Sequence, residues 1–107
     1  MPVWVLLSFA IVSEVAATVA LRYTEGFSRL VPSVVVVVGY GASFVLLALV
    51  LQRLSLGVTY AIWAGAGTAL IAAFGMLALG EEATPLKLAS LGLVIAGVIG
   101  LNLSGAH

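Results

Sequence analysis

Four long apolar runs divide the chain, and the few charged residues fall between them. The runs cover about 2–21, 32–51, 58–79 and 86–103. A helix rises about 1.5 Å per residue, so about 20 residues cross the roughly 30 Å hydrocarbon core of a membrane. Each run is close to this length. The pattern therefore predicts an all-α membrane protein with four transmembrane helices in a single domain, 1–107.

The connections between the runs contain residues that end or begin helices. Glu25-Gly26 interrupts the first run, and Pro32 and Pro85 suit early helical positions of the second and fourth runs. The connections are short, so consecutive helices are expected to be antiparallel neighbours. Residues 34–38 are all valine and favour a strand in water. An isolated strand in lipid leaves its backbone groups unpaired, so a helix is expected there too.

Composition excludes several classes of protein. The 107 residues are 64% hydrophobic and 7% charged, whereas about 25% of residues are charged in a soluble domain. Four Lys and Arg balance four Asp and Glu, which removes the basic surface that nucleic-acid binding requires. The chain has no cysteine and one histidine, His107, so no disulfide framework, metal site or cofactor is expected.

A cleaved signal peptide is the competing interpretation of residues 1–20. Ala16, Ala17 and Ala20 are small residues of the kind found near cleavage sites. The segment lacks a basic region beyond its own amine, however, and it contains a carboxylate, Glu14. A first transmembrane helix is therefore the preferred interpretation.

The basic residues give only a weak signal for membrane orientation. Arg22, Arg29 and Lys87 lie in or beside the first and third connections, and Arg53 lies in the second. The Lys and Arg bias between the two sides sets the orientation of a membrane protein. Because this bias is small, copies with opposite orientations can both insert. A dimer of oppositely oriented copies is therefore physically possible.

Glu14 is the one acidic or basic residue deep within a predicted span. A charge near the bilayer midplane costs about 2.5 to 3.5 kcal/mol on insertion scales, so such a carboxylate is by default a candidate functional group. The alternative is a neutral side chain that only hydrogen-bonds to a neighbouring helix. Ala10, Ala17 and Thr18 recur with Glu14 at spacings of three and four. These small residues predict either close helix packing or a cavity around a carboxylate that takes and releases a proton.

Aromatic residues share helix faces in the second and third runs. Tyr40 and Ser43 lie on one face, and Tyr60 and Trp63 lie on another. Aromatic rings attract cations, most strongly when both are out of water. Tyr60 also fits a simple membrane-interface role, but Trp63 lies about one turn deeper. A buried carboxylate with Tyr and Trp nearby suits an organic cation.

Glycines and other small residues mark the middle of the third run and one side of the fourth. Gly65 and Gly67 predict either a hinge or close packing, because paired glycines permit both. The fourth run carries a series of small residues that predicts packing and dimerisation: Ser90, Gly92, Ala96, Gly97 and Gly100.

Several short motifs follow one another along the first three runs. They are Ser13-Glu14-Val15, Glu25-Gly26-Phe27-Ser28-Arg29-Leu30, Pro32-Ser33, Gly39-Tyr40, Ser43-Phe44 and Tyr60-Ala61-Ile62-Trp63-Ala64-Gly65-Ala66-Gly67. With these motifs and four expected spans, essentially the whole chain resembles the small multidrug resistance transporters of bacteria and archaea.

This resemblance implies a multi-pass protein of the cytoplasmic, or inner, membrane that exchanges protons for small organic cations. It implies an antiparallel, dual-topology homodimer in which Glu14 binds both protons and substrate. It further implies that Tyr60 and Trp63 line the substrate site and that Tyr40, Ser43 and Thr18 are secondary contacts. Ala10 and Ala17 are taken as substrate-site residues on the same helix face as Glu14.

Two branches of the family differ near the membrane glutamate. The guanidinium exporters usually have Trp three residues after it, where this chain has Ala17. The ending Asn102-Leu103 also resembles the branch that exports quaternary ammonium compounds and other drugs. Ser90 departs from that branch, which commonly has Gly there. A multidrug antiporter is therefore expected, with a guanidinium antiporter as the alternative.

Two other classes of protein retain some of these features. A proton-carrying ring subunit of a rotary motor also has one buried carboxylate, but in a later helix and without an aromatic pair like Tyr60 and Trp63. A non-transporting membrane subunit that only packs against a larger partner does not need Glu14. A secondary active transporter, and not an enzyme, remains the expectation.

Overall fold

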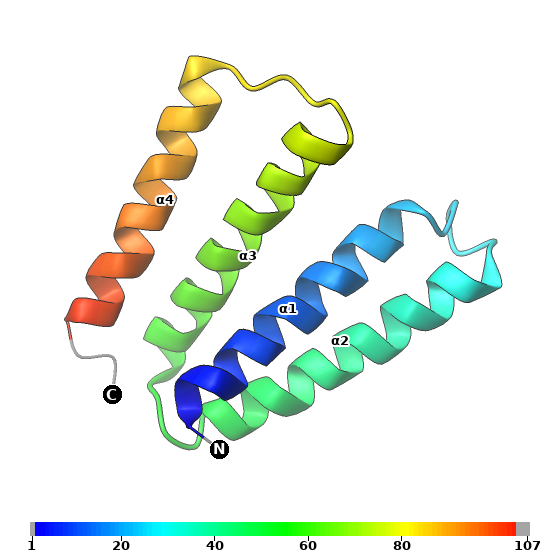
Figure 1. The fold of residues 1–107 in the computed structure, drawn as a ribbon. Coiled ribbons are helices and arrows are strands. Elements are labelled where there is room, and N and C mark those ends of the chain that lie inside the picture. Colours follow the sequence, from blue (N-terminus) through cyan, green and yellow to red (C-terminus); the bar gives the residue numbers. More distant parts are fainter. Residues whose placement is uncertain (1, 105–107) are drawn as a thin grey trace. The chain divides into compact units, whose positions relative to one another are not determined.

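The computed structural model describes residues 2–104 and contains four α-helices within that range. In chain order they are α1 (Val3–Arg22), α2 (Leu30–Val50), α3 (Leu56–Ala78) and α4 (Pro85–Leu103) (Figure 1). Each is long and apolar enough to cross a membrane. The prediction of an all-α protein with four membrane-spanning helices is confirmed. His107 lies outside the described residues.

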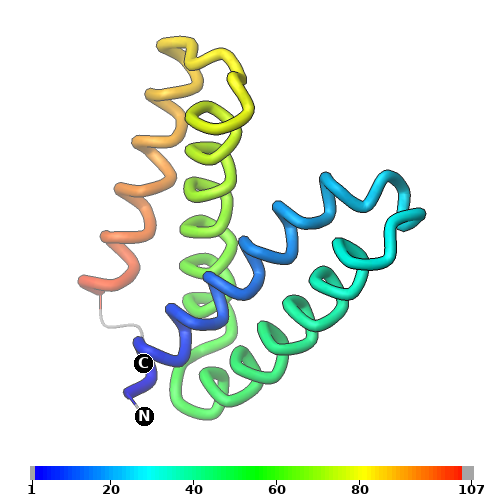
Figure 2. The backbone as a smooth tube through the Cα atoms, turned by 45° about the vertical axis from the view of Figure 1, so that its right-hand side comes forward, coloured from blue at the N-terminus to red at the C-terminus, as the bar shows by residue number. Residues whose placement is uncertain are grey.

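The helices form two compact units, Met1–Arg53 and Leu54–His107. The first unit contains α1 and α2, and the second contains α3 and α4. Within each unit the two helices lie side by side and run in opposite directions (Figures 1 and 2). Each unit is therefore a helical hairpin, as the short connections predict.

Thr24 organises the turn between α1 and α2. Its Oγ1 donates to the Leu21 carbonyl oxygen at 2.9 Å and accepts from the Phe27 amide at 3.2 Å. The turn has φ angles of 49° at Glu25, 72° at Gly26 and 66° at Phe27. This left-handed region suits glycine and is uncommon for other residues. The helix thus ends where Glu25-Gly26 predicts an interruption.

The α1–α2 hairpin packs closely around Gly39. A Cβ atom added to Gly39 would lie 2.8 Å from the Ala17 Cβ and 3.2 Å from the Ser13 carbonyl oxygen. Only a residue without a side chain fits at this distance. The contact brings the backbone of α2 against the face of α1 that carries Ala17.

The α3–α4 hairpin begins its second helix with a capped N-terminus. The Thr84 side chain accepts a hydrogen bond of 3.1 Å from the Lys87 amide, and Pro85 occupies the first turn. Within the hairpin, a Cβ atom on Gly65 would lie 2.7 Å from the Val98 Cγ2, so Gly65 is a close-packing position. No residue of α4 is buried.

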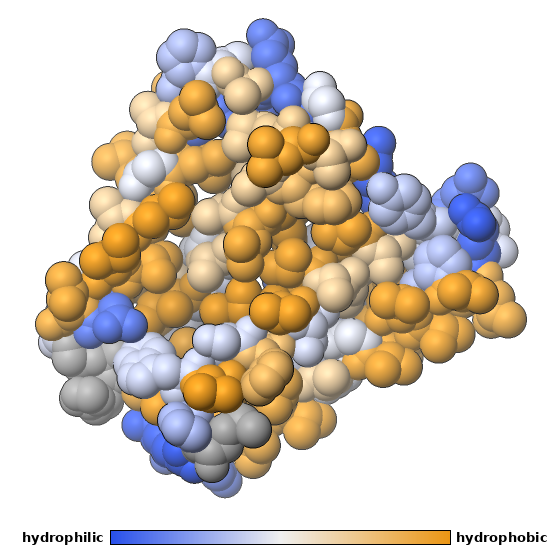
Figure 3. All heavy atoms as spheres, in the orientation of Figure 1, coloured by the Kyte–Doolittle hydropathy of each residue, from blue (hydrophilic) through white to orange (hydrophobic). Residues whose placement is uncertain are grey.

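Large apolar side chains are exposed on all four helices. Examples are Leu77 at 87% and Leu103 at 81% exposure. On the face drawn in Figure 3, hydrophobic residues cover the helices and hydrophilic residues gather mostly at the helix ends. Lipid chains are as apolar as these side chains, so a bilayer and not water is the solvent that this surface fits.

Replacement of Gly39 by Ala tests the close approach of α1 and α2. The added methyl group has no space beside Ala17, and overpacking of this kind costs about 1 to 3 kcal/mol. Gly39→Ala should therefore lower the thermal unfolding midpoint of the detergent-solubilised protein. Gly41→Ala is the matched control, because a Cβ there meets nothing within 4 Å. Equal stability of the two variants would contradict the packing.

Candidate functional site

Glu14 lies near the middle of α1, and its two carboxylate oxygens have different surroundings. Oε1 accepts a hydrogen bond of 3.0 Å from the Thr18 hydroxyl, one turn along the same helix. Oε2 is buried and has no hydrogen-bond partner in the described part of the chain. A buried acceptor without a partner is costly, so Oε2 is suited to a proton or a cation.

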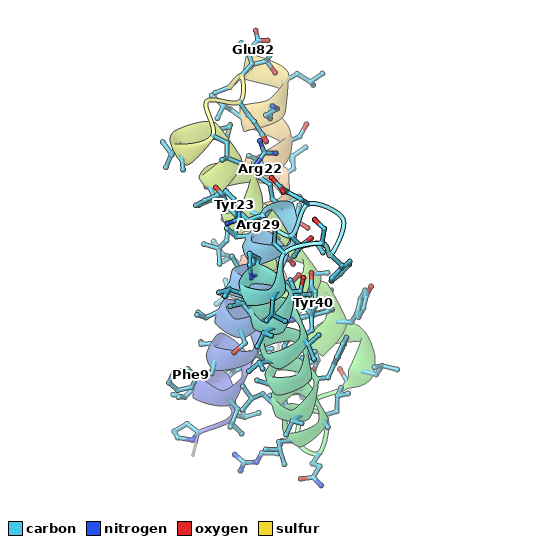
Figure 4. All side chains as sticks on the ribbon, turned by 90° about the vertical axis from the view of Figure 1, so that its right-hand side faces the viewer. Phe9, Arg22, Tyr23, Arg29, Tyr40 and Glu82 are labelled. Carbon is cyan, nitrogen blue, oxygen red and sulfur yellow. The ribbon has the colours of Figure 1, made fainter. Side chains whose placement is uncertain are left out.

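Tyr40 and Ser43 bring two hydroxyl groups from α2 to the same stretch of α1. The Tyr40 Oη is 2.6 Å from the Thr18 Oγ1, and the Ser43 Oγ donates to the Ala10 carbonyl oxygen at 2.9 Å. Tyr40 lies partway along α2, beyond the turn that carries Arg22 and Arg29 (Figure 4). The structure thus connects Tyr40 to Glu14 through Thr18.

The small residues beside Glu14 are buried by helix packing. Ala10, Ala17 and Ser43 are each 0% exposed. Ala17 lies against Gly39, and the Ser43 hydroxyl is bound to the backbone at Ala10. Of the two sequence interpretations for Ala10 and Ala17, close packing describes their surroundings in this hairpin. Their role as substrate contacts stays a prediction.

Tyr60 and Trp63 form an aromatic pair on α3. Their ring centroids are 5.7 Å apart, and the ring planes are inclined by 59°. Tyr60 is 61% exposed, and Trp63 is half-buried. The spacing of three residues places both rings on one helix face, where a cation can approach their surfaces.

The predicted hinge and dimer residues have distinct surroundings. Gly65 packs against Val98, and Gly67 is buried within the same unbroken helix. The α4 residues that the sequence analysis assigned to dimerisation are all exposed: Ser90, Gly92, Ala96, Gly97 and Gly100. Their surface is therefore available to a partner, while hinge motion at Gly65 and Gly67 stays a prediction.

Two apolar grooves run along the hairpins. One, of about 480 Å³, is lined by α1 and α2 residues that include Ser13, Val38 and Gly39. The other, of about 300 Å³, is lined by α3 and α4 residues that include Gly65 and Val98. Neither groove is lined by Glu14 or by the aromatic pair. The candidate site is therefore defined by the carboxylate and its hydrogen-bond partners, and not by either of these two grooves.

Two residues near these groups were not predicted from the sequence to belong to the candidate site. Gly39 entered only as part of a motif, although it permits the helix approach that brings Tyr40 to Thr18. Thr59 is 1% exposed, and its hydroxyl has no hydrogen-bond partner within residues 2–104. Its position next to Tyr60 was the available signal.

The chemistry of the site is that of a single carboxylate with hydroxyl neighbours. Among residues 2–104, no group of three or more His, Cys, Asp or Glu side chains is placed to hold a metal ion. The arrangement can bind a proton or an organic cation at Glu14, whose carboxylate accepts a hydrogen bond from Thr18, which in turn bonds to Tyr40.

Known proteins resemble the chain along nearly its full length. The sequence model of the family described as Small Multidrug Resistance protein matches residues 2–94. A quaternary ammonium compound-resistance protein, QacE, of Escherichia coli is 45% identical over 94% of the chain and 91% of its own length.

Two relatives are named guanidinium exporters. The one from Salmonella typhimurium is 47% identical over 97% of the chain and 98% of its own length. The one from Escherichia coli K12 is 46% identical over 94% of the chain and 96% of its own length. Four apolar helices, a membrane carboxylate and these matches together show that the chain is a multi-pass membrane protein of the Small Multidrug Resistance family.

Proposed function

We propose that the chain is a proton-coupled antiporter that exports hydrophobic and quaternary ammonium cations across the cytoplasmic, or inner, membrane. The family and the names of the relatives indicate a transporter and not an enzyme. The observation that carries the finer proposal is the Glu14 carboxylate. It lies in an apolar helix, with one oxygen bound to Thr18 and the other buried without a hydrogen-bond partner among residues 2–104.

The proposed mechanism is a competition for Glu14. A cation binds while the carboxylate is ionised, and a proton displaces it. Both bound forms neutralise the charge, which lowers the cost of holding Glu14 within the membrane. Only a protein with a proton or a cation bound at Glu14 then changes the side of the membrane to which its site opens. Protons that move inward therefore drive cations outward.

Tyr60 and Trp63 are proposed to supply the aromatic surface of the substrate site. Their rings lie 5.7 Å apart on one face of α3, and Tyr60 is largely exposed. A desolvated cation gains about 2 kcal/mol or more from a good aromatic contact. Tyr40, Ser43 and Thr18 remain proposed members of the site on the α1–α2 hairpin.

An antiparallel homodimer is proposed as the working unit. The exposed small residues of α4, Gly92, Ala96, Gly97 and Gly100, offer a surface on which a second α4 can approach closely. Two oppositely oriented copies would also supply the two inequivalent halves that alternating access requires, as inverted repeats do in larger transporters.

Guanidinium export is the second candidate function. It is favoured by the two relatives named guanidinium exporters, which are 47% and 46% identical to the chain. Ala17 argues for the first candidate, because a bulky residue there would meet the backbone of α2 at Gly39. The α1–α2 hairpin therefore has no space for a large hydrogen-bonding side chain at this position.

Replacement of Glu14 tests the coupling. Glu14→Gln keeps the size of the side chain but cannot ionise, so substrate-driven proton release and coupled uptake into proteoliposomes should both be abolished. Glu82→Gln is the matched control, because Glu82 lies outside the helices and is exposed. Substrate-coupled proton flux in Glu14→Gln would rule out this mechanism.

A comparison of substrates separates the two candidate functions. Proteoliposomes with a pH gradient should transport tetraphenylphosphonium and benzalkonium-type cations at rates well above that for guanidinium. Guanidinium is planar and requires acceptors matched to its fixed donors, whereas an apolar aromatic site favours large hydrophobic cations. Comparable rates for guanidinium and a quaternary ammonium cation would favour the second candidate.

Lysine substitutions test the antiparallel dimer. Glu82→Lys with Ala83→Lys adds positive charge to the side that carries Lys87, and Gln52→Lys with Ser55→Lys adds it to the side of Arg53. Each pair should bias insertion to one orientation and reduce resistance to quaternary ammonium compounds, because oppositely oriented partners become scarce.

Co-expression of the two double variants should restore that resistance. Labelling of single introduced cysteines from each side of the membrane reports the orientation of each variant. Full activity of one variant alone in a single confirmed orientation would exclude the antiparallel dimer.

A further inference from the structure

A chain of hydrogen bonds with a defined direction connects α2 to Glu14. The Thr18 Oγ1 is 3.0 Å from the Glu14 Oε1 and 2.6 Å from the Tyr40 Oη. A threonine hydroxyl carries one hydrogen, and an ionised carboxylate can only accept. Thr18 therefore donates to Glu14, and Tyr40 donates to Thr18, whenever Glu14 is ionised.

A second contact from α2 reaches the backbone of α1 one turn before Glu14. The Ser43 Oγ donates to the Ala10 carbonyl oxygen at 2.9 Å, and Ser43 is fully buried. In an α-helix the carbonyl of residue 10 also accepts from the amide of residue 14. The helix α2 thus meets α1 at two points beside Glu14. Tyr40 bonds to Thr18, which bonds to the Glu14 side chain, and Ser43 bonds to the Ala10 carbonyl one turn earlier.

These contacts make the two carboxylate oxygens inequivalent. Oε1 accepts a hydrogen bond from Thr18, whereas Oε2 is buried and has no partner within the described range, 2–104. We propose that Thr18 and Tyr40 are positioning residues that fix the Glu14 carboxylate, so that protons and cations exchange at Oε2 alone. This assignment rests on the proposed function and gives both residues a role other than direct contact with substrate.

Hydroxyl groups orient the Glu14 carboxylate because α2 contains no charged side chain that could bind it. Within Leu30–Val50, Tyr40 is the one titratable side chain, and it faces Thr18. On α1 itself, Arg22 lies about two turns from Glu14, at the end of the helix. A charge-assisted hydrogen bond is stronger than a neutral one, so one hydroxyl can orient the ionised carboxylate.

The test compares variants that remove one hydroxyl at a time. Thr18→Val and Tyr40→Phe each break the chain with little change of shape, while Thr18→Ser keeps the hydroxyl. Ser8→Ala is the matched control, because the Ser8 hydroxyl bonds only to the Trp4 carbonyl of its own helix, at 2.8 Å. Circular dichroism and thermal unfolding establish that each variant is folded.

The first readout is the affinity for tetraphenylphosphonium as a function of pH. Thr18→Val should bind about tenfold more weakly at acidic pH, the size expected for loss of a hydrogen bond to a charged group. The loss should shrink at alkaline pH, because the lost bond favours the ionised form over the protonated form. Tyr40→Phe should show a smaller change with the same pH trend, and Thr18→Ser and Ser8→Ala should match the wild type.

The second readout is the infrared C=O stretch of protonated Glu14 in the absence of substrate. Glutamate labelled with carbon-13, with the Glu14→Gln spectrum subtracted, isolates this band. Thr18→Val should move the band, whereas Thr18→Ser and Ser8→Ala should leave it in place. If Thr18→Val does not fold, Tyr40→Phe takes its place. Tyr40→Phe should then move the band, whereas Thr18→Ser should leave it in place.

Two outcomes would overturn the assignment. An affinity loss in Thr18→Val that is equal at all pH values, with an unchanged infrared band, would make Thr18 a simple substrate contact. Wild-type behaviour of both Thr18→Val and Tyr40→Phe would remove their role altogether. A wild-type protein that binds no tetraphenylphosphonium would contradict the proposed function instead. The infrared comparison would still show whether Thr18 positions the Glu14 carboxylate.

Discussion

A carboxylate within a membrane has no water to accept hydrogen bonds from, and this constraint governs the α1–α2 hairpin. Any polar group there that lacks a partner is costly, so its hydrogen bonds must come from the protein or from a ligand. Thr18 supplies one such bond to Glu14, and the second oxygen has no partner in the part of the chain that the structure describes. The same physical cost supports the proposal that Glu14 exchanges protons and cations.

The close approach of two helix backbones makes this arrangement possible. Gly39 lies against Ala17 with no space for a further carbon atom. At this separation Tyr40, the next residue, reaches Thr18, and Ser43, one turn later, reaches the backbone at Ala10. A glycine, an alanine and two hydroxyl residues therefore act together, because the small residues set the distance across which the hydroxyl groups form hydrogen bonds.

The α3–α4 hairpin is built differently. Gly65 on α3 accommodates Val98, while α4 has no buried residue and carries exposed small residues along its length. A helix with this surface is suited to contact with another helix as well as with lipid. The aromatic pair on α3 is likewise accessible at Tyr60. These features are expected of a unit that completes its packing by association.

The sequence alone determined the four helices and made Glu14 the leading candidate for a functional residue. Apolar runs of about 20 residues can satisfy their backbone groups in lipid only as helices, so their number and approximate positions follow from the order of residues. A lone carboxylate within such a run can also be recognised from the sequence, which is why Glu14 was predicted to be a functional group. The motifs around Glu14 and Tyr60 also sufficed to predict the family.

Only the tertiary structure decided which residues of α2 the neighbours of Glu14 contact. Helical spacing places Ala10, Ala17 and Thr18 on one face of α1, but it does not say which of them meets α2. In the structure Ala17 packs on Gly39, while Thr18 joins Glu14 to Tyr40. Periodicity fixes directions around one helix axis, whereas a contact of 2.6 Å between two helices depends on how closely their backbones pack, and that distance is set by the tertiary structure.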